Sequence, residues 1–236
     1  MSGAGLRRRS TVTELMDDPD CDPRALERTY ADFRVVNGIV AGWRRTYVRL
    51  LRPLLARDRP TTLLDIGSGG GDIPRALARW AARDRLRLTV TAIDPDARAH
   101  RFATSRPAPA GVEFRRAASS ELVAEGRVYD LVTSNHLLHH LDADALAALL
   151  ADSAALARCR VVHGDLERSR VALAFYGPAT LPFARRSFIH TDGLRSIRRS
   201  YRRAELAAAA PPGWRVERQF PYRLLLTLDP VSGHRP

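Results

Sequence analysis

A short apolar run followed by four glycines restricts the possible folds of this chain more than any other feature. The run at 62–66 is typical of a buried strand, and apolar residues at helical spacing after position 72 predict a helix directly behind it. Between them, Gly67, Gly69, Gly70 and Gly71 allow turns that side chains forbid, and they let a ligand lie against the backbone. The segment therefore predicts a strand, a ligand-binding turn and a helix of an α/β fold.

Short apolar runs alternate with helical stretches along the rest of the chain, which is typical of a mostly parallel sheet with helices on both faces. The runs that predict strands are 62–66, 86–93, 112–116, 129–134, 160–164, 214–220 and 222–228. Pro221 separates the last two by a distance that permits only a hairpin, so the last strand must run antiparallel to its neighbour. We therefore predict a doubly wound, seven-stranded, mostly parallel sheet.

Two segments stand apart from this pattern. The first residues are polar and acidic behind three arginines, whereas the next stretch carries an apolar residue every three or four positions, with breaks expected at Asn37-Gly38 and Gly42. The predicted parts are a flexible arm at 1–22, N-terminal helices at 23–58 and the sheet domain at 59–236, with a helical insertion at 171–200 after the fifth strand.

Composition excludes several classes of protein. All 38 basic residues are arginine, so the net charge of +12 reflects an arginine-rich and alanine-rich usage and is weak support for a nucleic-acid partner. Cys21 and Cys159 match neither a metal-binding spacing nor a disulfide framework, which favours a reducing cytoplasm. No apolar run approaches the roughly 18 residues of a membrane span. We expect a cytoplasmic protein without a membrane segment.

The glycine loop also restricts the ligand. A dinucleotide-binding fingerprint needs a glycine three positions after Gly69, where this chain has the acid Asp72, and a phosphate-binding loop needs a lysine, which the chain lacks. With these two motifs excluded, the glycine loop suits a ligand that has an adenosine but no phosphate. Asp94 closes the second predicted strand, where a carboxylate can accept both ribose hydroxyl protons, a feature that NAD enzymes share.

This loop resembles the first motif of the class I S-adenosylmethionine-dependent methyltransferases. The run at 129–142, which contains Leu138-His139-His140, resembles the fourth motif of the small-molecule members, and the terminal hairpin matches as well. The resemblance covers about residues 60–228. It implies the strand order 3-2-1-4-5-7-6 with strand 7 antiparallel, and S-adenosylmethionine as the cofactor.

The resemblance also implies which residues hold the donor. They are Asp65, Gly67, Ser68, Gly69, Gly71, Asp94, Pro95, Ser119, Ser120 and Asn135. Asp65 would lie near the amino group of the donor or order the glycine loop, and Asn135 has the alternative role of a helix cap. An acid that binds adenine normally ends the third strand, and here Ala117-Ala118-Ser119-Ser120 stands in its place, so the adenine contacts stay open.

Histidines after the fourth strand point to proton removal. A phenol with a pKa of about 10 is a poor nucleophile, and a histidine with a pKa of about 6.5 is a suitable general base. We expect His139 or His140 to be this base, with His139 preferred, because consecutive side chains diverge by about 100°. Asp165 follows the neighbouring fifth strand and would fix the tautomer of the base. No metal ligands are expected.

The helices at 23–58 and the insertion carry aromatic residues beyond what the sheet needs. We expect them to form a lid over an apolar acceptor, with substrate contacts from Tyr30, Phe33, Trp43, His136, Tyr176 and His190.

The sequence also contains an arginine cluster with one acid, Asp192. We interpret this cluster first as a solvated helix face, and otherwise as a surface for an acidic substrate, a carrier protein or RNA. Its members are Arg185, Arg186, Arg195, Arg198, Arg199, Arg202 and Arg203.

The missing motifs narrow the acceptor. No Asn-Pro-Pro-Tyr or Asp-Pro-Pro-Tyr follows the fourth strand, no Pro-Cys nucleophile exists, and no acid-rich set for Mg²⁺ is present. We therefore predict metal-independent, histidine-assisted methylation of a small aromatic acceptor, at a phenolic hydroxyl of a secondary metabolite. The alternatives are C-methylation of a phenol or quinone, methylation of RNA, and a non-catalytic S-adenosylmethionine-binding module. The sequence leaves the oligomeric state open.

Overall fold

The computed structural model describes residues 6–40 and 42–230, so the parts of the predicted arm, lid and sheet domain at 1–5, 41 and 231–236 lie outside it. One seven-stranded sheet forms the centre, in the order β3-β2-β1-β4-β5-β7-β6. Its strands are β1 Thr61–Ile66, β2 Leu88–Ile93, β3 Val112–Arg115, β4 Tyr129–Asn135, β5 Ala157–Leu166, β6 Arg215–Gln219 and β7 Arg223–Leu228. The pairings among the first five strands are all parallel: β1 pairs with β2 and β4, β2 with β3, and β4 with β5. β7 is antiparallel to both β5 and β6. The predicted fold and strand order are confirmed.

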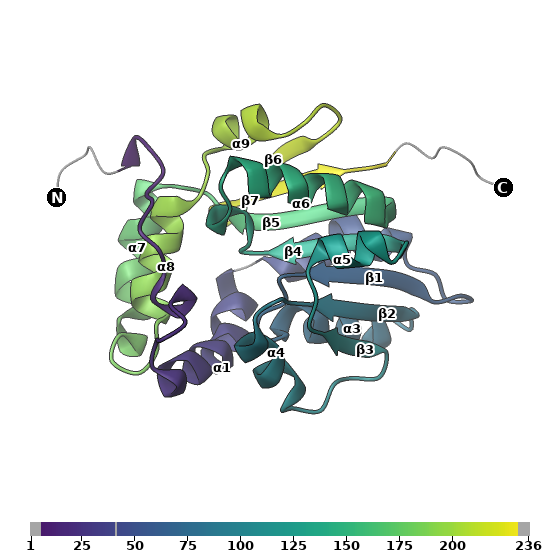
Figure 1. Ribbon diagram of the computed structural model, residues 1–236, viewed down its shortest axis with the longest axis horizontal. Coiled ribbons are helices and arrows are strands. Elements are labelled where there is room, and N and C mark those ends of the chain that lie inside the picture. The colour runs from purple at the N-terminus through teal and green to yellow at the C-terminus, as the bar shows by residue number, and fades with distance from the viewer. Residues whose placement is uncertain (1–5, 41, 231–236) are drawn as a thin grey trace.

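Helices cover both faces of this sheet (Figure 1). They are α1 Pro23–Val40, α2 Trp43–Thr46, α3 Asp72–Arg83, α4 Ala97–Thr104, α5 Ser119–Ala124, α6 Ala143–Leu156, α7 Arg170–Thr180, α8 Ile189–Arg199 and α9 Arg203–Ala209. Shorter helical turns are η2 Leu15–Asp17, η3 Tyr47–Leu51, η4 Arg52–Leu54, η5 Leu138–His140 and η6 Leu181–Phe183. The predicted insertion after β5 is thus helical, as α7, η6 and α8.

The side chains of each strand point alternately to the two faces of the sheet, so a hydrophobic core lies on each face. Leu64 packs with α5, α6 and α9, whereas its neighbour Leu63 packs on the opposite face with α3 and the segment from Trp43 to Leu55. Successive side chains of a strand point to opposite faces of the sheet, so a strand buried on both faces reads as a continuous apolar run. This accounts for the run that precedes the glycine loop.

Of the two breaks expected in the N-terminal helices, the one at Gly42 is confirmed and the one at Asn37-Gly38 is wrong. Asn37 and Gly38 lie inside α1, and the second helix begins after Gly42, whose φ of 64° is left-handed. Asn37 instead donates a side-chain hydrogen bond to Asp72 at the start of α3, at 3.0 Å. A tertiary contact therefore compensates for the weak helix propensity of this pair.

The described part of the predicted flexible arm is not loose. Residues 6–22 run along α7 and α8 (Figure 1), and the backbone amide of Ser10 donates to the carbonyl of Arg198 at 3.0 Å. The carboxylate of Asp192 accepts from the amides of Leu15 and Met16 at 2.7 and 3.0 Å. The arm lacks apolar periodicity because polar contacts, rather than an apolar face, attach it.

The carboxyl ends of β1 and β4 point toward α1, α7, α8 and the arm (Figure 1). In open α/β sheets this edge is where ligands bind. In the described part of the chain, no helix combines the length and the apolar character needed to cross a bilayer.

Candidate active site

The glycine loop connects β1 to α3 through three left-handed residues. Gly67, Gly69 and Gly71 have φ of 68°, 51° and 75°, and the amide of Gly67 donates to the carbonyl of Ile93 at the end of β2. A Cβ at Gly71 would lie 2.5 Å from the ring of Phe114, so this position admits only glycine. A Cβ at Gly69 would meet only Tyr30, at 3.9 Å, so the space beside Gly69 is open to a ligand.

Asp94 lies beside this loop. One carboxylate oxygen accepts from the amide of Gly69 at 2.8 Å, and the other accepts from the amide of Asp96 at 2.9 Å. Each carboxylate oxygen can accept about two hydrogen bonds, so both oxygens keep capacity for the hydroxyls of a ribose. The loop and Asp94 therefore fit the adenosine half of S-adenosylmethionine. Pro95 follows, and its carbonyl accepts from Arg116 at 3.2 Å.

Asp65 is buried at the end of β1. Its carboxylate accepts from the hydroxyl of Thr133 on β4 at 2.7 Å, so its hydrogen bond ties it to the neighbouring strand and not to the glycine loop. Burial raises the pKa of Asp65 to about 7, and the charges of Asp72 and Asp94 act in the same direction. An ammonium group nearby would favour the ionised form, which suits the first of the two roles expected for this residue.

The serines that were expected to help hold the donor differ in their surroundings. The hydroxyl of Ser119 donates to Asp152 on α6 at 2.6 Å, which turns it toward that helix, and Ser120 is exposed. Ser68 is buried, and its amide donates to the carbonyl of Ile93 at 3.0 Å. Asn135 does not cap a helix through its side chain, because its amide oxygen accepts from Arg223 at 2.6 Å.

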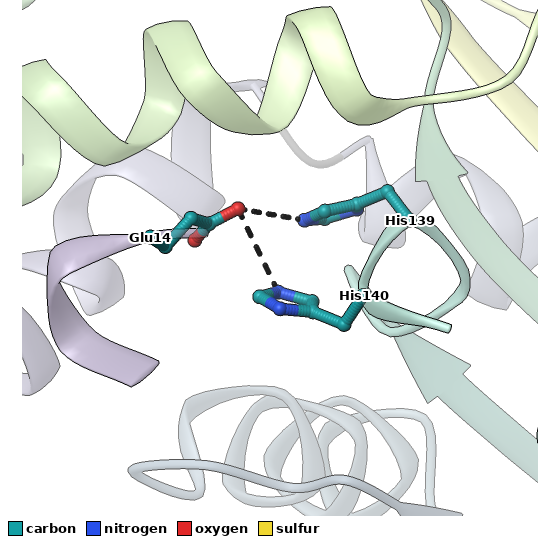
Figure 2. Close-up of side chains that lie close together, drawn as sticks. All are labelled: Glu14, His139 and His140. Carbon is teal, nitrogen blue, oxygen red and sulfur yellow. Dashed lines mark ion pairs between the residues drawn. The ribbon is translucent and has the colours of Figure 1, made fainter. Parts of the chain in front are cut away.

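His139 lies between two carboxylates from distant parts of the chain. Its ring Nδ1 is 2.7 Å from Asp165, whose other oxygen accepts from the backbone amide of His139 at 2.8 Å. On the opposite side of the ring, Nε2 lies 3.2 Å from Oε1 of Glu14 in the arm (Figure 2). His139 and Glu14 are only 1% and 4% exposed. Asp165 thus lies where the argument from neighbouring strand ends predicts, but Glu14 was not predicted.

The electrostatics follow from this arrangement. Burial lowers the pKa of His139, but Asp165 and Glu14 outweigh it and raise the pKa to about 9. Burial raises the pKa of Glu14 and of Asp165, yet His139 holds both below their ordinary values. Both nitrogens of His139 face carboxylates, and this arrangement favours binding of a cation, such as a second ring proton, between Glu14 and Asp165. The simple arrangement that the sequence suggests, with one free nitrogen for an acceptor, is not the one observed.

His140 turns toward the same glutamate. Its Nε2 lies 3.7 Å from Oε1 of Glu14, and its Nδ1 lies 3.1 Å from Asp17. The ring centroids of His139 and His140 are 4.3 Å apart (Figure 2). The expected divergence of consecutive side chains is wrong here, because both residues lie in the short turn η5 and acids of the arm draw both rings to one side.

His136 has a different environment. Its φ of 58° is left-handed, and its Nε2 accepts a hydrogen bond from Arg223, a guanidinium that is 1% exposed on β7. Burial lowers the pKa of His136 well below its ordinary value, and the charge of Arg223 adds to this effect. His136 is therefore a neutral acceptor for Arg223, and its expected contact with the substrate stays a prediction.

The predicted substrate aromatics do not converge on one site. Tyr30 packs over the glycine loop and against Phe102, with ring centroids 5.2 Å apart, and Phe33 packs against the same group. Trp43 is buried in the core below the sheet, because the helical stripe that contains it faces β5. Tyr176 donates to the carbonyl of Ile189, and His190 pairs with Thr180, so these two join α7 to α8.

Part of the arginine cluster holds the arm. Arg195 donates to the carbonyl of Thr13 at 2.7 Å, Arg199 contacts Asp17 at 3.3 Å, and Arg202 donates to the carbonyl of Leu6 at 2.8 Å. Elsewhere in the cluster, Arg186 pairs with Asp32 and Arg203 donates to Val216. Arg185, Arg186, Arg202 and Arg203 are exposed, so the solvated face expected first describes this part of the cluster.

Glu14, Asp17 and Arg223 are the residues that sequence reasoning missed. Nothing in the acidic, aperiodic arm marks Glu14 or Asp17. Arg223 carries one signal, since it is an arginine at the start of an apolar strand, and a buried charge of this kind needs partners.

Comparison with known proteins agrees with the fold. A family model described as "Methyltransferase domain" matches residues 63–160. The curated "Ubiquinone biosynthesis O-methyltransferase" of Methylobacterium sp. (strain 4-46) is 37% identical over 82 residues, which cover 34% of this chain. The match spans only 30% of the length of that relative.

Two solved structures show the likeness over most of the chain. The plantazolicin methyltransferase BpumL, in complex with a triazolic desmethylPZN analog and SAH, has a TM-score of 0.59 at 13% identity, over 92% of this chain and 93% of its own. Human N-acetylserotonin methyltransferase, in complex with SAM, has a TM-score of 0.62 at 9% identity, over 88% of this chain and 56% of its own. Residues 63–160 therefore match a methyltransferase domain, and the chain has the fold of these two methyltransferases.

Proposed function

We propose that the chain transfers a methyl group from S-adenosylmethionine to a small aromatic acceptor, at a phenolic hydroxyl, with assistance from His139 and His140. The observation that carries this proposal is the position of the histidines relative to the glycine loop. A Cβ at Gly67 would lie 3.2 Å from Leu137, the residue before η5, so the loop and the histidine segment touch. A donor in the loop and an acceptor at the histidines would therefore be neighbours.

The donor carries its methyl group on a sulfonium sulfur, and the bond between the methyl carbon and this sulfur breaks readily. Asp94 would hold the ribose hydroxyls, the open backbone at Gly69 would lie against the ligand, and Asp65 would face the amino group. Tyr30 would cover the loop, because its ring lies 3.9 Å from the position that a Cβ at Gly69 would take. Tyr30 thus belongs to the donor side of the proposed site rather than to the acceptor side.

The reaction needs an acceptor oxygen that has lost its proton. A lone pair of that oxygen forms the new bond to the methyl carbon, the electron pair of the broken carbon–sulfur bond stays on sulfur, and the hydroxyl proton passes to a base beside the acceptor or to water. A phenol with a pKa of about 10 ionises little at neutral pH, so a group that promotes loss of the proton accelerates the step. The cluster of Glu14, His139 and His140 is the polar group suited to this role. Alignment of the two reactants contributes as well.

The surrounding segments would exclude water from this step. The arm, α1 and the α7–α8 insertion all lie at the carboxyl edge of the sheet (Figure 1). We assign α1 and residues 171–200 to the walls of the site, with the arm as a third wall that brings Glu14. The rest of the predicted lid at 23–58 does not share this role, because Trp43, Tyr47, Leu51 and Leu55 pack in the core. Exclusion of water strengthens the electrostatic interactions inside such a site.

O-methylation takes precedence over C-methylation because the curated relative is named an O-methyltransferase. We rank methylation of RNA below both, because Arg195 and Arg202, two of the arginines that would bind phosphates, contact the arm instead. The test is incubation of the full chain with methyl-labelled S-adenosylmethionine and a panel of phenols, quinols and tRNA. We expect label in a phenol, and label in tRNA alone would contradict the proposal.

A further inference from the structure

We propose that Glu14, His139 and His140 bind one divalent transition-metal ion with the ligand preference of zinc. This inference deepens the proposed function, on which its catalytic consequence rests, because it states how the two histidines act. Each residue offers one ligand atom, Oε1 of the glutamate and Nε2 of each histidine, and the three atoms lie within 4.8 Å of one another. Figure 2 shows both rings turned toward the glutamate oxygen.

The distances match a common centre. Zinc binds imidazole nitrogen and carboxylate oxygen at about 2.0–2.2 Å, so two ligands at a tetrahedral angle lie about 3.4 Å apart. Nε2 of His139 is 3.2 Å from Oε1 of Glu14, and Nε2 of His140 is 3.7 Å from the same oxygen. These two distances are within about 0.3 Å of the value for a shared ion, and the three ligand atoms all lie within 4.8 Å of one another.

The outer contacts orient the ligands for a metal. A metal-binding histidine almost always gives its other ring N–H to a carboxylate, a carbonyl or water, which fixes the tautomer and aims the free lone pair at the ion. Nδ1 of His139 lies 2.7 Å from Asp165, and Nδ1 of His140 lies 3.1 Å from Asp17. The ligating oxygen of Glu14 is fixed in turn, since Ser196 donates to it at 2.6 Å.

An unpartnered atom gives independent support. Nε2 of His139 is buried, and it makes no hydrogen bond to any residue that the structure describes, although Glu14 is close. With both Nδ1 atoms committed to acids, a metal ion that displaces the proton from Nε2 of His139 would meet three electron-pair donors, the two Nε2 atoms and the glutamate oxygen. Such donors repel one another unless a cation lies between them, and a proton serves only one pair whereas a metal ion serves all three.

The ligand set indicates the kind of ion and its chemistry. Two imidazoles and one carboxylate suit zinc and its first-row neighbours, and not magnesium, which prefers oxygen ligands. Three protein ligands leave a fourth position open, as in catalytic zinc sites. The phenolic oxygen would take this position, the ion would lower the pKa of its hydroxyl, and the proton would pass to water before the oxygen attacks the methyl carbon.

The test begins with binding by the full chain after treatment with a chelator. Calorimetry with ZnCl₂ should give one ion per chain, and Co²⁺ should give the visible absorption bands of a tetrahedral site. Glu14→Gln and His140→Ala should each weaken zinc binding about 100-fold or more, and Asp17→Asn about 10-fold. Glu27→Gln is the matched control on an exposed position of α1, and it should bind as the parent chain does.

Absence of saturable zinc binding by the parent chain, or equal affinity in the parent chain and both ligand variants, would overturn the inference and leave a proton as the occupant. The Co²⁺ spectrum of the parent chain needs no variant, so it decides even where a variant fails to fold. Methyl transfer and binding of S-adenosylhomocysteine are measured separately on the chelated chain. Turnover without metal would contradict the inference alone, whereas zinc binding without any methyl transfer would contradict the proposed function alone.

Discussion

The carboxylate of Asp165 accepts two hydrogen bonds from His139, one from the ring Nδ1 at 2.7 Å and one from the backbone amide at 2.8 Å. This double contact joins the end of β5 to the turn after β4, and it fixes both the ring and the backbone of the histidine. The orientation of the His139 ring toward Glu14 therefore depends on Asp165. Under the proposed function, we assign Asp165 the role of a positioning residue.

Asp165→Asn should consequently separate turnover from donor binding. The amide keeps the size of the carboxylate but loses its charge, so the ring is held less firmly and kcat should fall about 10- to 100-fold. Affinity for S-adenosylhomocysteine should stay unchanged, because the donor loop lies at β1. Asp144→Asn, at an exposed position of α6, is the control. Full turnover in Asp165→Asn would show that the contact has no part in the reaction.

Asp94→Ala should weaken donor binding. Loss of two charge-assisted hydrogen bonds to the ribose costs on the order of 2–3 kcal/mol, or roughly 30- to 160-fold in affinity. Calorimetry with S-adenosylhomocysteine measures this directly, and a thermal unfolding curve shows whether the variant remains folded. Affinity equal to that of the parent chain would remove Asp94 from the donor site.

The buried Asp65 predicts a pH dependence of stability. Its pKa of about 7 in the folded chain exceeds the unfolded value of about 3.9, so the folded state holds a proton that the unfolded state releases. Its contribution to the free energy of unfolding therefore falls as pH rises from about 4 to 7. Thr133 faces the carboxylate, and the nearby charges of Asp72 and Asp94 act in the same direction as burial.

Asp65→Asn lacks this ionisation but keeps an acceptor for Thr133. The stability of the variant relative to the parent chain should therefore be greater at pH 8 than at pH 5. Urea unfolding of both proteins at the two pH values gives this difference. A difference that stays constant between pH 5 and 8 would mean that Asp65 ionises normally in the folded chain.

Salt should have little effect on binding of the acceptor. A partner that neutralises several phosphates would make log affinity fall with log salt at a slope of about −0.7 per phosphate on single strands, whereas a neutral phenol would give almost no slope. The arginines of α8 already contact the arm, which favours the flat result. Steep, salt-sensitive binding of tRNA would place RNA ahead of a small molecule.

The donor side of the site could be predicted because its signals are local. The glycine loop, Asp94 and the terminal hairpin depend on residues that are close in sequence, and their spacing reflects the backbone conformation directly. The acceptor side depends on contacts between distant segments. Glu14 lies in a polar arm whose pairing with His139 leaves no periodic pattern, so no feature of the sequence indicated it.

The aromatic residues show a second limit. The helical spacing of Trp43 and Tyr30 identifies one buried face, but not what that face packs against. Trp43 turned out to lie in the core beneath β5, and Tyr30 over the glycine loop. A stripe of apolar residues is therefore better support for a packed helix than for a substrate contact.

The central claim is methyl transfer to a phenolic oxygen, and the most direct test is to locate the methyl group in the product. The full chain is incubated with methyl-labelled S-adenosylmethionine and the phenol that the panel identifies, with Asp94→Ala as the variant of impaired donor binding, and the product is analysed by tandem mass spectrometry. We predict one labelled methyl group on the phenolic oxygen, and slower product formation by the variant at limiting donor. Label on a ring carbon, or no labelled phenol at all, would contradict the account.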